Sequence, residues 1–155
     1  MGRLHVEVEK CQLNKHGEEL CGDSVEVEAG PDSTIVVLSD GLGSGVKANI
    51  LSSLTVRMAV TMLKGGLKLE EVVDTFVHTL PVCEKRQLAY STFSILQIFN
   101  DGNVYLAEYD SPPAFIGRGS HLRTVPRSER IMDERVIREA FFSVEDGDWI
   151  VLVSD

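Results

Sequence analysis

The sequence has no uninterrupted apolar run of the roughly 18 residues that a membrane-spanning helix needs. Basic residues are also in short supply, because 15 Lys and Arg stand against 24 Asp and Glu, for a net charge of −9. Binding to nucleic acid or to an anionic membrane requires clustered positive charge, so both functions are disfavoured. An acidic chain with converging carboxylates is instead suited to divalent cations.

Cysteine is scarce and odd in number, and Cys11, Cys21 and Cys83 form no CxxC pair. This pattern fits reduced thiols in a cytoplasmic protein. The first residues are too charged and too few for a signal peptide, and we find no repeat, low-complexity segment or linker. A chain of 155 residues is about the size of one domain with its own core. We therefore expect a single domain over residues 1–155.

The most informative stretch is residues 34–45, TIVVLSDGLGSG. An apolar run leads into Asp40 and is followed by three glycines, which predicts a strand, a tight turn and the start of a helix. A dinucleotide fingerprint would need glycine in place of Val46, and a P-loop would need Lys-Ser or Lys-Thr in place of Lys47-Ala48. Two interpretations stay open: a flexible helix entry, or a site where Asp40 and the Gly41 carbonyl bind a cation while helix-end N–H groups face an anion.

Three aspartates lie at the ends of predicted strands. Asp40 follows Val-Leu-Ser, Asp155 follows Leu-Val-Ser, and Asp23 precedes a strand directly after Gly22. If these strands are neighbours, the three carboxylates converge, and their repulsion has to be offset by cations. Oxygen ligands favour Mg²⁺ or Mn²⁺, and a pair of such ions can activate water against a phosphoryl group. The alternative is that these acids, like most in so acidic a chain, are merely solvated.

The remaining pattern predicts an α+β layered fold, because two helices follow one another and most strands come in hairpins. We expect helices at 46–64 and 70–79, and we expect the apolar stripe of the first helix to pack in the core. That stripe consists of Val46, Ile50, Leu54, Met58 and Met62. Residues 136–144 fit either a strand or a short helix, and residues 126–134 fit a loop. Strands are expected at 3–11, 25–29, 34–39, 91–99, 104–109, 115–116, 122–125 and 149–153, the last of them buried.

Other candidate residues give weaker evidence of a functional site. The four histidines, His5, His16, His78 and His121, have no metal-binding spacing and are expected at the surface. The chain has no GxSxG motif, so no Ser-His-Asp triad can be assembled from the sequence.

Four segments, taken in order, resemble the metal-dependent PPM-type serine/threonine phosphatases, and more narrowly their SpoIIE/RsbX-like bacterial branch. The segments are residues 21–24 (CGDS), 37–48 (VLSDGLGSGVKA), 111–118 (SPPAFIGR) and 147–155 (GDWIVLVSD). The resemblance implies an αββα sandwich, in which two packed antiparallel β-sheets are flanked by helices and a two-metal site lies at one end. It also implies that a further strand and a last metal-binding aspartate follow Asp155, so we expect the domain to lack that strand and ligand.

Carried over residue by residue, the resemblance makes Asp40 the ligand that bridges two divalent cations, Mn²⁺ or Mg²⁺. Asp23 and the backbone carbonyl of Gly41 would hold one ion, and Asp155 the other. Asp23 and Asp40 are thus the expected catalytic residues, and a metal-bridging water would attack phosphoserine or phosphothreonine in line.

The same resemblance implies a substrate class and leaves an alternative. The substrates would be phosphorylated STAS-type regulatory proteins of a bacterial stressosome or partner-switching pathway. The alternative is a catalytically incomplete, phosphatase-like module that docks to a signalling partner. A nucleotide-binding domain is disfavoured by Val46 and by the absence of alternating strand and helix units.

Overall fold

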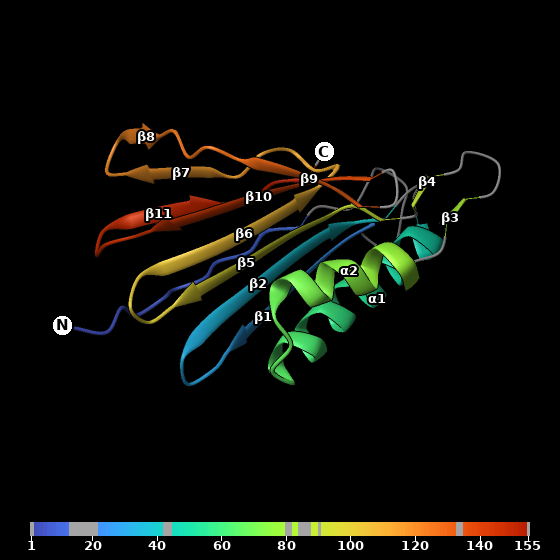
Figure 1. The fold of residues 1–155 in the computed structure, drawn as a ribbon, viewed down its shortest axis with the longest axis horizontal. Coiled ribbons are helices and arrows are strands. Elements are labelled where there is room, and N and C mark those ends of the chain that lie inside the picture. The colour runs from blue at the N-terminus through green and yellow to red at the C-terminus, as the bar shows by residue number, and fades with distance from the viewer. Residues whose placement is uncertain are drawn as a thin grey trace.

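The computed structural model describes residues 2–12, 22–41, 45–79, 82–83, 88–89, 91–132 and 135–154. This part of the chain forms a layer of two helices, a six-stranded antiparallel sheet and a smaller three-stranded antiparallel sheet (Figure 1). The strand order is β1-β2-β5-β6-β10-β9 in the large sheet and β11-β7-β8 in the small one. The elements are β1 (Asp23–Ala29), β2 (Ser33–Asp40), α1 (Gly45–Lys64), α2 (Leu69–Thr79), β3 (Val82–Cys83), β4 (Leu88–Ala89), β5 (Phe93–Phe99), β6 (Asn103–Tyr109), β7 (Phe115–Arg118), β8 (His121–Arg123), β9 (Ser128–Met132), β10 (Arg135–Ser143) and β11 (Asp148–Val151). The predicted α+β fold with two packed antiparallel sheets is confirmed.

Strand β2 lies inside the large sheet and is covered on both faces, as its continuous apolar run predicts. Ile35 and Val37 pack into the core between the sheet and the helices, whereas Val36 packs into the core between the two sheets. The period-two alternation of the strand therefore divides its side chains between two cores. A strand held in this way is a rigid support for the residue at its end, Asp40.

Helix α1 is present as predicted, but its predicted buried face is confirmed only in the second half, where Met58 and Met62 are partly buried against the core. Val46, Ile50 and Leu54 belong to the same predicted stripe but are 62%, 59% and 45% exposed. The face that packs on β1 and β2 is made of small or hydroxyl-bearing residues in its first half and of aliphatic residues toward its end. Its fully buried or nearly buried members are Ala48, Ser52, Thr55, Val56, Ala59, Val60 and Leu63. Small residues let the helix lie close to the sheet, so side-chain size rather than hydrophobicity alone selected the inner face.

Helix α2 follows its prediction closely. Val72, Val73 and Phe76 are buried, and the Phe76 ring meets the Phe93 ring of β5 edge to face, with centroids 5.4 Å apart. Such an aromatic pair contributes about 1 kcal/mol beyond the area that it buries. The helix thereby joins the helical layer to the middle of the sheet.

Two predictions of strand and loop are wrong, and one open choice is decided. Residues 3–11 were expected to form a strand, but they form none, because Leu4 N–Asn100 O is the only backbone hydrogen bond found for this segment in the described chain. Residues 126–134 were expected to form a loop, yet β9 lies within them and pairs with β10. Of residues 136–144, which fitted a strand or a short helix, residues 136–143 are strand. The last predicted strand, β11, is half-buried to exposed rather than buried.

A buried ion pair fixes the long connection after β6. The Glu108 side chain, 2% exposed, accepts hydrogen bonds from Ala114 N at 2.6 Å and from Arg127 Nε at 3.0 Å. Arg127 also donates to the carbonyl oxygens of Val125 and Ala114, at 2.6 and 3.0 Å. One guanidinium thus holds β6 and the segments on either side of the β7–β8 hairpin together.

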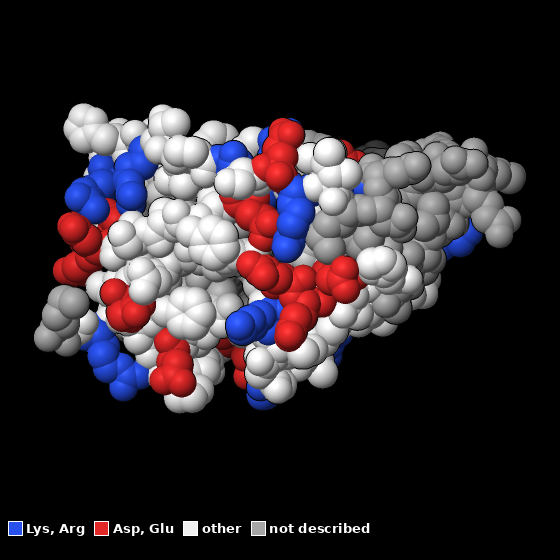
Figure 2. Space-filling model, viewed as in Figure 1, with Lys and Arg blue, Asp and Glu red and all other residues white. Residues whose placement is uncertain are grey.

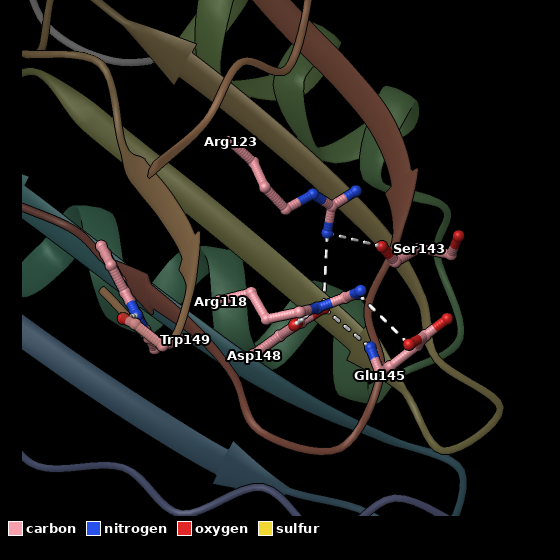
Figure 3. Close-up of polar contacts among 7 residues, drawn as sticks. Arg118, Arg123, Ser143, Glu145, Asp148 and Trp149 are labelled. Atoms are coloured by element: carbon pink, nitrogen blue, oxygen red, sulfur yellow. Dashed lines mark hydrogen bonds and ion pairs between the residues drawn. The ribbon is translucent and has the colours of Figure 1, made fainter. Parts of the chain in front are cut away.

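A second charged cluster, at the surface, joins β7, β8 and β11 (Figure 3). Asp148 Oδ1 accepts a hydrogen bond from Arg118 Nε at 2.6 Å, and Asp148 Oδ2 accepts one from Arg118 Nη2 at 3.1 Å. Arg123 Nη1 lies 3.4 Å from the same Oδ2. The hydrogen bond from Arg118 is the main cause that lowers the pKa of Asp148 from 3.8 to about 2, against the opposing effect of its burial. A neighbouring hydrogen bond from Trp149 Nε1 to the Gly119 carbonyl, at 2.8 Å, fixes the hairpin further.

The lowered pKa of Asp148 makes stability depend on acid pH. Because the folded pKa lies below the unfolded one, the ion pair contributes its full stability above about pH 4 and loses it as the pH falls toward 2. The Asp148 side chain is 1% exposed but that of Arg118 is 52% exposed, so solvent screens the pair and we expect its contribution to the free energy of unfolding to be small. The free energy of unfolding, measured with urea at pH 5 and at pH 2, should fall less between these two pH values for Asp148→Asn than for the wild type. For the matched variant Asp146→Asn, in the same turn, the free energy of unfolding should fall as much as for the wild type. Equal falls for all three proteins would contradict the assignment of the acid dependence to Asp148.

The surface carries clustered acidic side chains, in agreement with the net charge of −9 of the sequence. In Figure 2, acidic side chains gather over α2, where Glu70, Glu71 and Asp74 are exposed. No helix in the described part of the chain is long and apolar enough to cross a membrane.

Candidate metal centre

The two aspartates singled out in the first half of the sequence lie directly opposite each other. Asp23 opens β1, Asp40 closes β2, and the antiparallel register pairs these two residues. Residues paired across such a ladder point to the same face, with Cβ atoms about 5 Å apart. The alternation of the strands places both carboxylates on the face of Val25 and Leu38, toward the smaller sheet.

The end of β2 is held by the chain just before β5. Thr92 N donates to the Asp40 carbonyl at 3.0 Å, Thr92 Oγ1 accepts from Asp40 N at 3.3 Å, and Ser39 Oγ donates to the Thr92 carbonyl at 2.7 Å. Gly41 N then donates to the Gly22 carbonyl at 3.0 Å, which ties the end of β2 to the start of β1. The backbone on both sides of Asp40 is therefore fixed.

Gly41 is required by close packing against α1. A Cβ built on this residue would lie 2.0 Å from the Ala48 carbonyl oxygen, which belongs to the backbone of α1. No side chain fits there, so glycine lets the helix approach the end of β2. Residues 42–44, the rest of the predicted glycine turn, lie outside the described residues.

Buried hydroxyl groups join this edge of the sheet to α1. Ser24 Oγ, next to Asp23, lies 2.8 Å from Ser52 Oγ, and Thr55 Oγ1 lies 2.6 Å from Ser91 Oγ. Sequence reasoning missed this network, although Ser52 and Thr55 are spaced three apart and so share one helix face. Since buried hydroxyls are costly unless paired, the network sets the position of α1 relative to Asp23.

The C-terminal end of the described chain lies next to Asp23. Ser154 Oγ donates to Asp23 Oδ2 at 2.6 Å, joining residues 131 positions apart. Asp155, the third predicted ligand, follows Ser154 in the sequence but lies outside the described residues. The structure thus brings Asp23 and Asp40 together, whereas the place of Asp155 stays a prediction.

The donors available here are oxygen atoms. Two aspartates are paired across the sheet and the Gly41 carbonyl follows Asp40, a set whose chemistry fits Mg²⁺ or Mn²⁺ better than softer metals. Across the described residues, no group of three or more His, Cys, Asp or Glu side chains comes together as a ready-made metal site. The predicted histidine positions agree with this, since His5, His78 and His121 are exposed and His16 is not described.

Comparison with known proteins decides the family. Residues 30–155 match the model of the family described as stage II sporulation protein E (SpoIIE). The chain belongs to the SpoIIE family. The match includes Asp40, Gly41 and Asp155, and Asp23 lies just before it.

Curated relatives of this SpoIIE-family chain are much longer than the part it matches. It is 26% identical to stage II sporulation protein E of Bacillus subtilis (strain 168) over 146 residues, 91% of this chain and 18% of that protein. It is 44% identical to phosphoserine phosphatase RsbX of the same organism over 45 residues, 29% of this chain and 23% of RsbX. The matched parts thus amount to less than a quarter of either relative.

Solved structures bear out the fold of the SpoIIE-family chain. The PP2C phosphatase domain of SpoIIE from Bacillus subtilis superposes with a TM-score of 0.80 at 24% identity, over 94% of this chain and 43% of that one. RsbX in complex with magnesium superposes with a TM-score of 0.66 at 21% identity, over 89% of this chain and 68% of that one. The chain therefore shares the fold of PP2C-type phosphatase domains, as its motifs predicted.

Proposed function

We propose that this SpoIIE-family chain is a metal-dependent phosphoprotein phosphatase that hydrolyses phosphoserine or phosphothreonine. The observation that carries the proposal is the register pairing of Asp23 with Asp40 at strand ends, beside the carbonyl of Gly41. Membership of a family homologous to PP2C-type phosphatases supports it.

In this proposal Asp40, Asp23 and the Gly41 carbonyl hold divalent cations, and Asp155 adds a further carboxylate. When bound, such ions polarise a phosphoryl oxygen and acidify water near neutral pH. The chain's own contribution is to fix the ligands: Thr92 and Gly22 immobilise the backbone around Asp40, and Ser154 orients one oxygen of Asp23. Preorganised ligands need no rearrangement during the reaction, which is where an enzyme gains most of its electrostatic effect.

We further propose that the substrate is a phosphorylated STAS-type regulator of a bacterial stressosome or partner-switching pathway. RsbX is named a phosphoserine phosphatase, and a structure described as part of the bacterial stressosome has the same fold, with a TM-score of 0.73 at 16% identity. The acidic surface is consistent with a protein substrate rather than a nucleic acid. Residues 1–155 would form most of one domain, with a last strand and a last aspartate outside them.

Metal dependence tests the enzyme proposal directly. The longest available gene product should hydrolyse p-nitrophenyl phosphate with saturating Mn²⁺, and a chelator should lower the rate by at least about 100-fold. Excess Mn²⁺ should restore the rate. Activity that survives the chelator would contradict the proposal.

The alternative is a catalytically incomplete, phosphatase-like module that docks to a signalling partner. It predicts no hydrolysis of a phosphorylated STAS protein with any Mn²⁺ concentration, together with measurable binding of that protein. Calorimetric titration and release of phosphate, measured on the same preparation, separate the two functions.

A further inference from the structure

The serines of the two Ser-Asp sequences make different contacts. Ser39, near the end of β2, is fully buried, and its Oγ donates to the Thr92 carbonyl, so it ties two segments of backbone together. Ser154, at the C-terminal end of the described chain, instead donates from its Oγ to Asp23 Oδ2 at 2.6 Å. The second serine therefore acts on the carboxylate of a candidate ligand rather than on the chain around it.

The backbone of Asp23 is fixed independently of its side chain. Gln12 Nε2 donates to the Asp23 carbonyl at 2.8 Å, and the Gly22 carbonyl just before it accepts from Gly41 N at 3.0 Å. The register pairing with Asp40 holds the same residue in the sheet. With the main chain held, a hydrogen bond at one carboxylate oxygen limits how the side chain can turn.

The hydrogen bond from Ser154 leaves Asp23 with one oxygen for a cation. An ionised carboxylate is only an acceptor, so Ser154 is the donor, and 2.6 Å lies in the range of strong hydrogen bonds to a charged oxygen. Among the described residues, we find no hydrogen bond to the other oxygen, Oδ1. Oδ2 is thus engaged within the protein, and Oδ1 is the oxygen that can face an ion.

We propose that Ser154 is a positioning residue that makes Asp23 a one-oxygen ligand and thereby favours Mg²⁺ and Mn²⁺ over Ca²⁺. This inference rests on the proposed function, because it takes Asp23 to be a ligand of the metal. Hydrogen bonds to the ligands of a metal orient them, and their loss typically weakens metal binding about 10–100-fold.

The preference follows from the coordination that each cation accepts. Ca²⁺ takes roughly six to eight oxygen atoms in flexible geometry and can bind both oxygens of one carboxylate, whereas Mg²⁺ demands a near-ideal octahedron. Mn²⁺ likewise suits an octahedral set of oxygens. A carboxylate whose Oδ2 is held by Ser154 gives a single oxygen to such an octahedron and cannot offer two to a larger ion. Removal of the hydroxyl would free the second oxygen for Ca²⁺.

The test compares cation affinities of the wild type, Ser154→Ala and Ser154→Thr in the longest available gene product. Electron paramagnetic resonance measures free Mn²⁺ directly, and displacement of bound Mn²⁺ by Mg²⁺ or Ca²⁺ gives the other two affinities. Ser154→Ala should bind Mn²⁺ and Mg²⁺ about tenfold more weakly than the wild type, and Ca²⁺ no more weakly. Ser154→Thr keeps the hydroxyl and should stay within about threefold of the wild type for all three cations.

Hydrolysis of p-nitrophenyl phosphate gives a second readout. In Ser154→Ala, the Mn²⁺ concentration for half-maximal rate should rise about tenfold, while KM for p-nitrophenyl phosphate at saturating Mn²⁺ stays the same. The control Ser143→Ala removes the hydroxyl of an exposed serine at the end of β10 and should leave every value unchanged. Circular dichroism checks that all variants fold.

The outcomes separate this inference from the proposed function. A wild type that binds no Mn²⁺ would overturn both. Mn²⁺ binding by the wild type with unchanged affinities in Ser154→Ala would overturn the role of Ser154 alone. An equal fall for Mn²⁺, Mg²⁺ and Ca²⁺ would do the same, because a hydroxyl that only stabilises the fold would weaken all three alike.

A crystal structure of the wild type with Mn²⁺ bound tests the inference without any variant. Asp23 should contact the ion through Oδ1 only, with Oδ2 still within hydrogen-bond distance of Ser154 Oγ. Contact of the ion with both oxygens of Asp23 would overturn the role of Ser154 and leave the proposed function standing.

Discussion

Asp40→Asn is expected to lower Mn²⁺-dependent hydrolysis of p-nitrophenyl phosphate by at least about 100-fold. The substitution keeps the shape of the side chain but removes a negative charge from the pair that Asp40 forms with Asp23. An amide is a weaker ligand for a hard cation than a carboxylate, so the proposed site would lose affinity as well as rate. Initial rates over a range of Mn²⁺ concentrations separate the two losses.

The control for this variant lies in the same hairpin. Asp32→Asn makes the same chemical change in the turn between β1 and β2, at the opposite end from Asp40. It should retain the wild-type rate, and both variants should melt within a few degrees of the wild type because neither position is part of the core. Similar rates for Asp40→Asn and the wild type would exclude Asp40 as a metal ligand.

Arg127→Met is expected to destabilise the fold by about 3–5 kcal/mol. The change removes the guanidinium that pairs with Glu108. It leaves a carboxylate buried at 2% exposure whose one remaining partner, among the described residues, is the Ala114 amide. It also removes the two hydrogen bonds to the carbonyls of Val125 and Ala114. Urea denaturation should show a lower midpoint at an unchanged slope, because the folded state loses stability without changing the area exposed on unfolding.

Two further variants identify the cause of that loss. Glu108→Gln combined with Arg127→Met removes the buried charge and should recover much of the stability lost in the single variant. Arg138→Met, at an exposed position on β10, should change the free energy of unfolding by less than about 0.5 kcal/mol. Equal losses for Arg127→Met and Arg138→Met would show that the buried pair does not stabilise the connection.

Much of the fold could be predicted because its signals are local. The hairpins β5–β6 and β7–β8 and the buried stripe of α2 follow from turn residues and periodicity. The convergence of Asp23 and Asp40 was also foreseeable, since both lie at the ends of strands joined by a short turn. Their role as ligands, and that of Asp155, stays a prediction.

The errors arose where tertiary contacts outweigh local pattern. In α1 the close approach of Ala48 to Gly41 selects small residues for the inner face, which leaves Val46 and Ile50 outside despite their hydrophobicity. Strand β9 was read as a loop because it is charged, yet Arg130 pairs with Glu139 of β10, with Nε and Oε1 3.0 Å apart. A charge pair across two strands is invisible until both strands are placed.

The length of the turn after β1 has a consequence for the spacing of the candidate ligands. Seven consecutive residue pairs run from Ala29 and Thr34 next to the turn to Asp23 and Asp40 at the far end. One residue added to or removed from the turn would offset the two aspartates by about 3.3 Å, and would move one of them to the helix side of the sheet. Residues 30–32 therefore determine, from the opposite end of the hairpin, whether two carboxylates can share one cation, although none of them contributes an atom to the site.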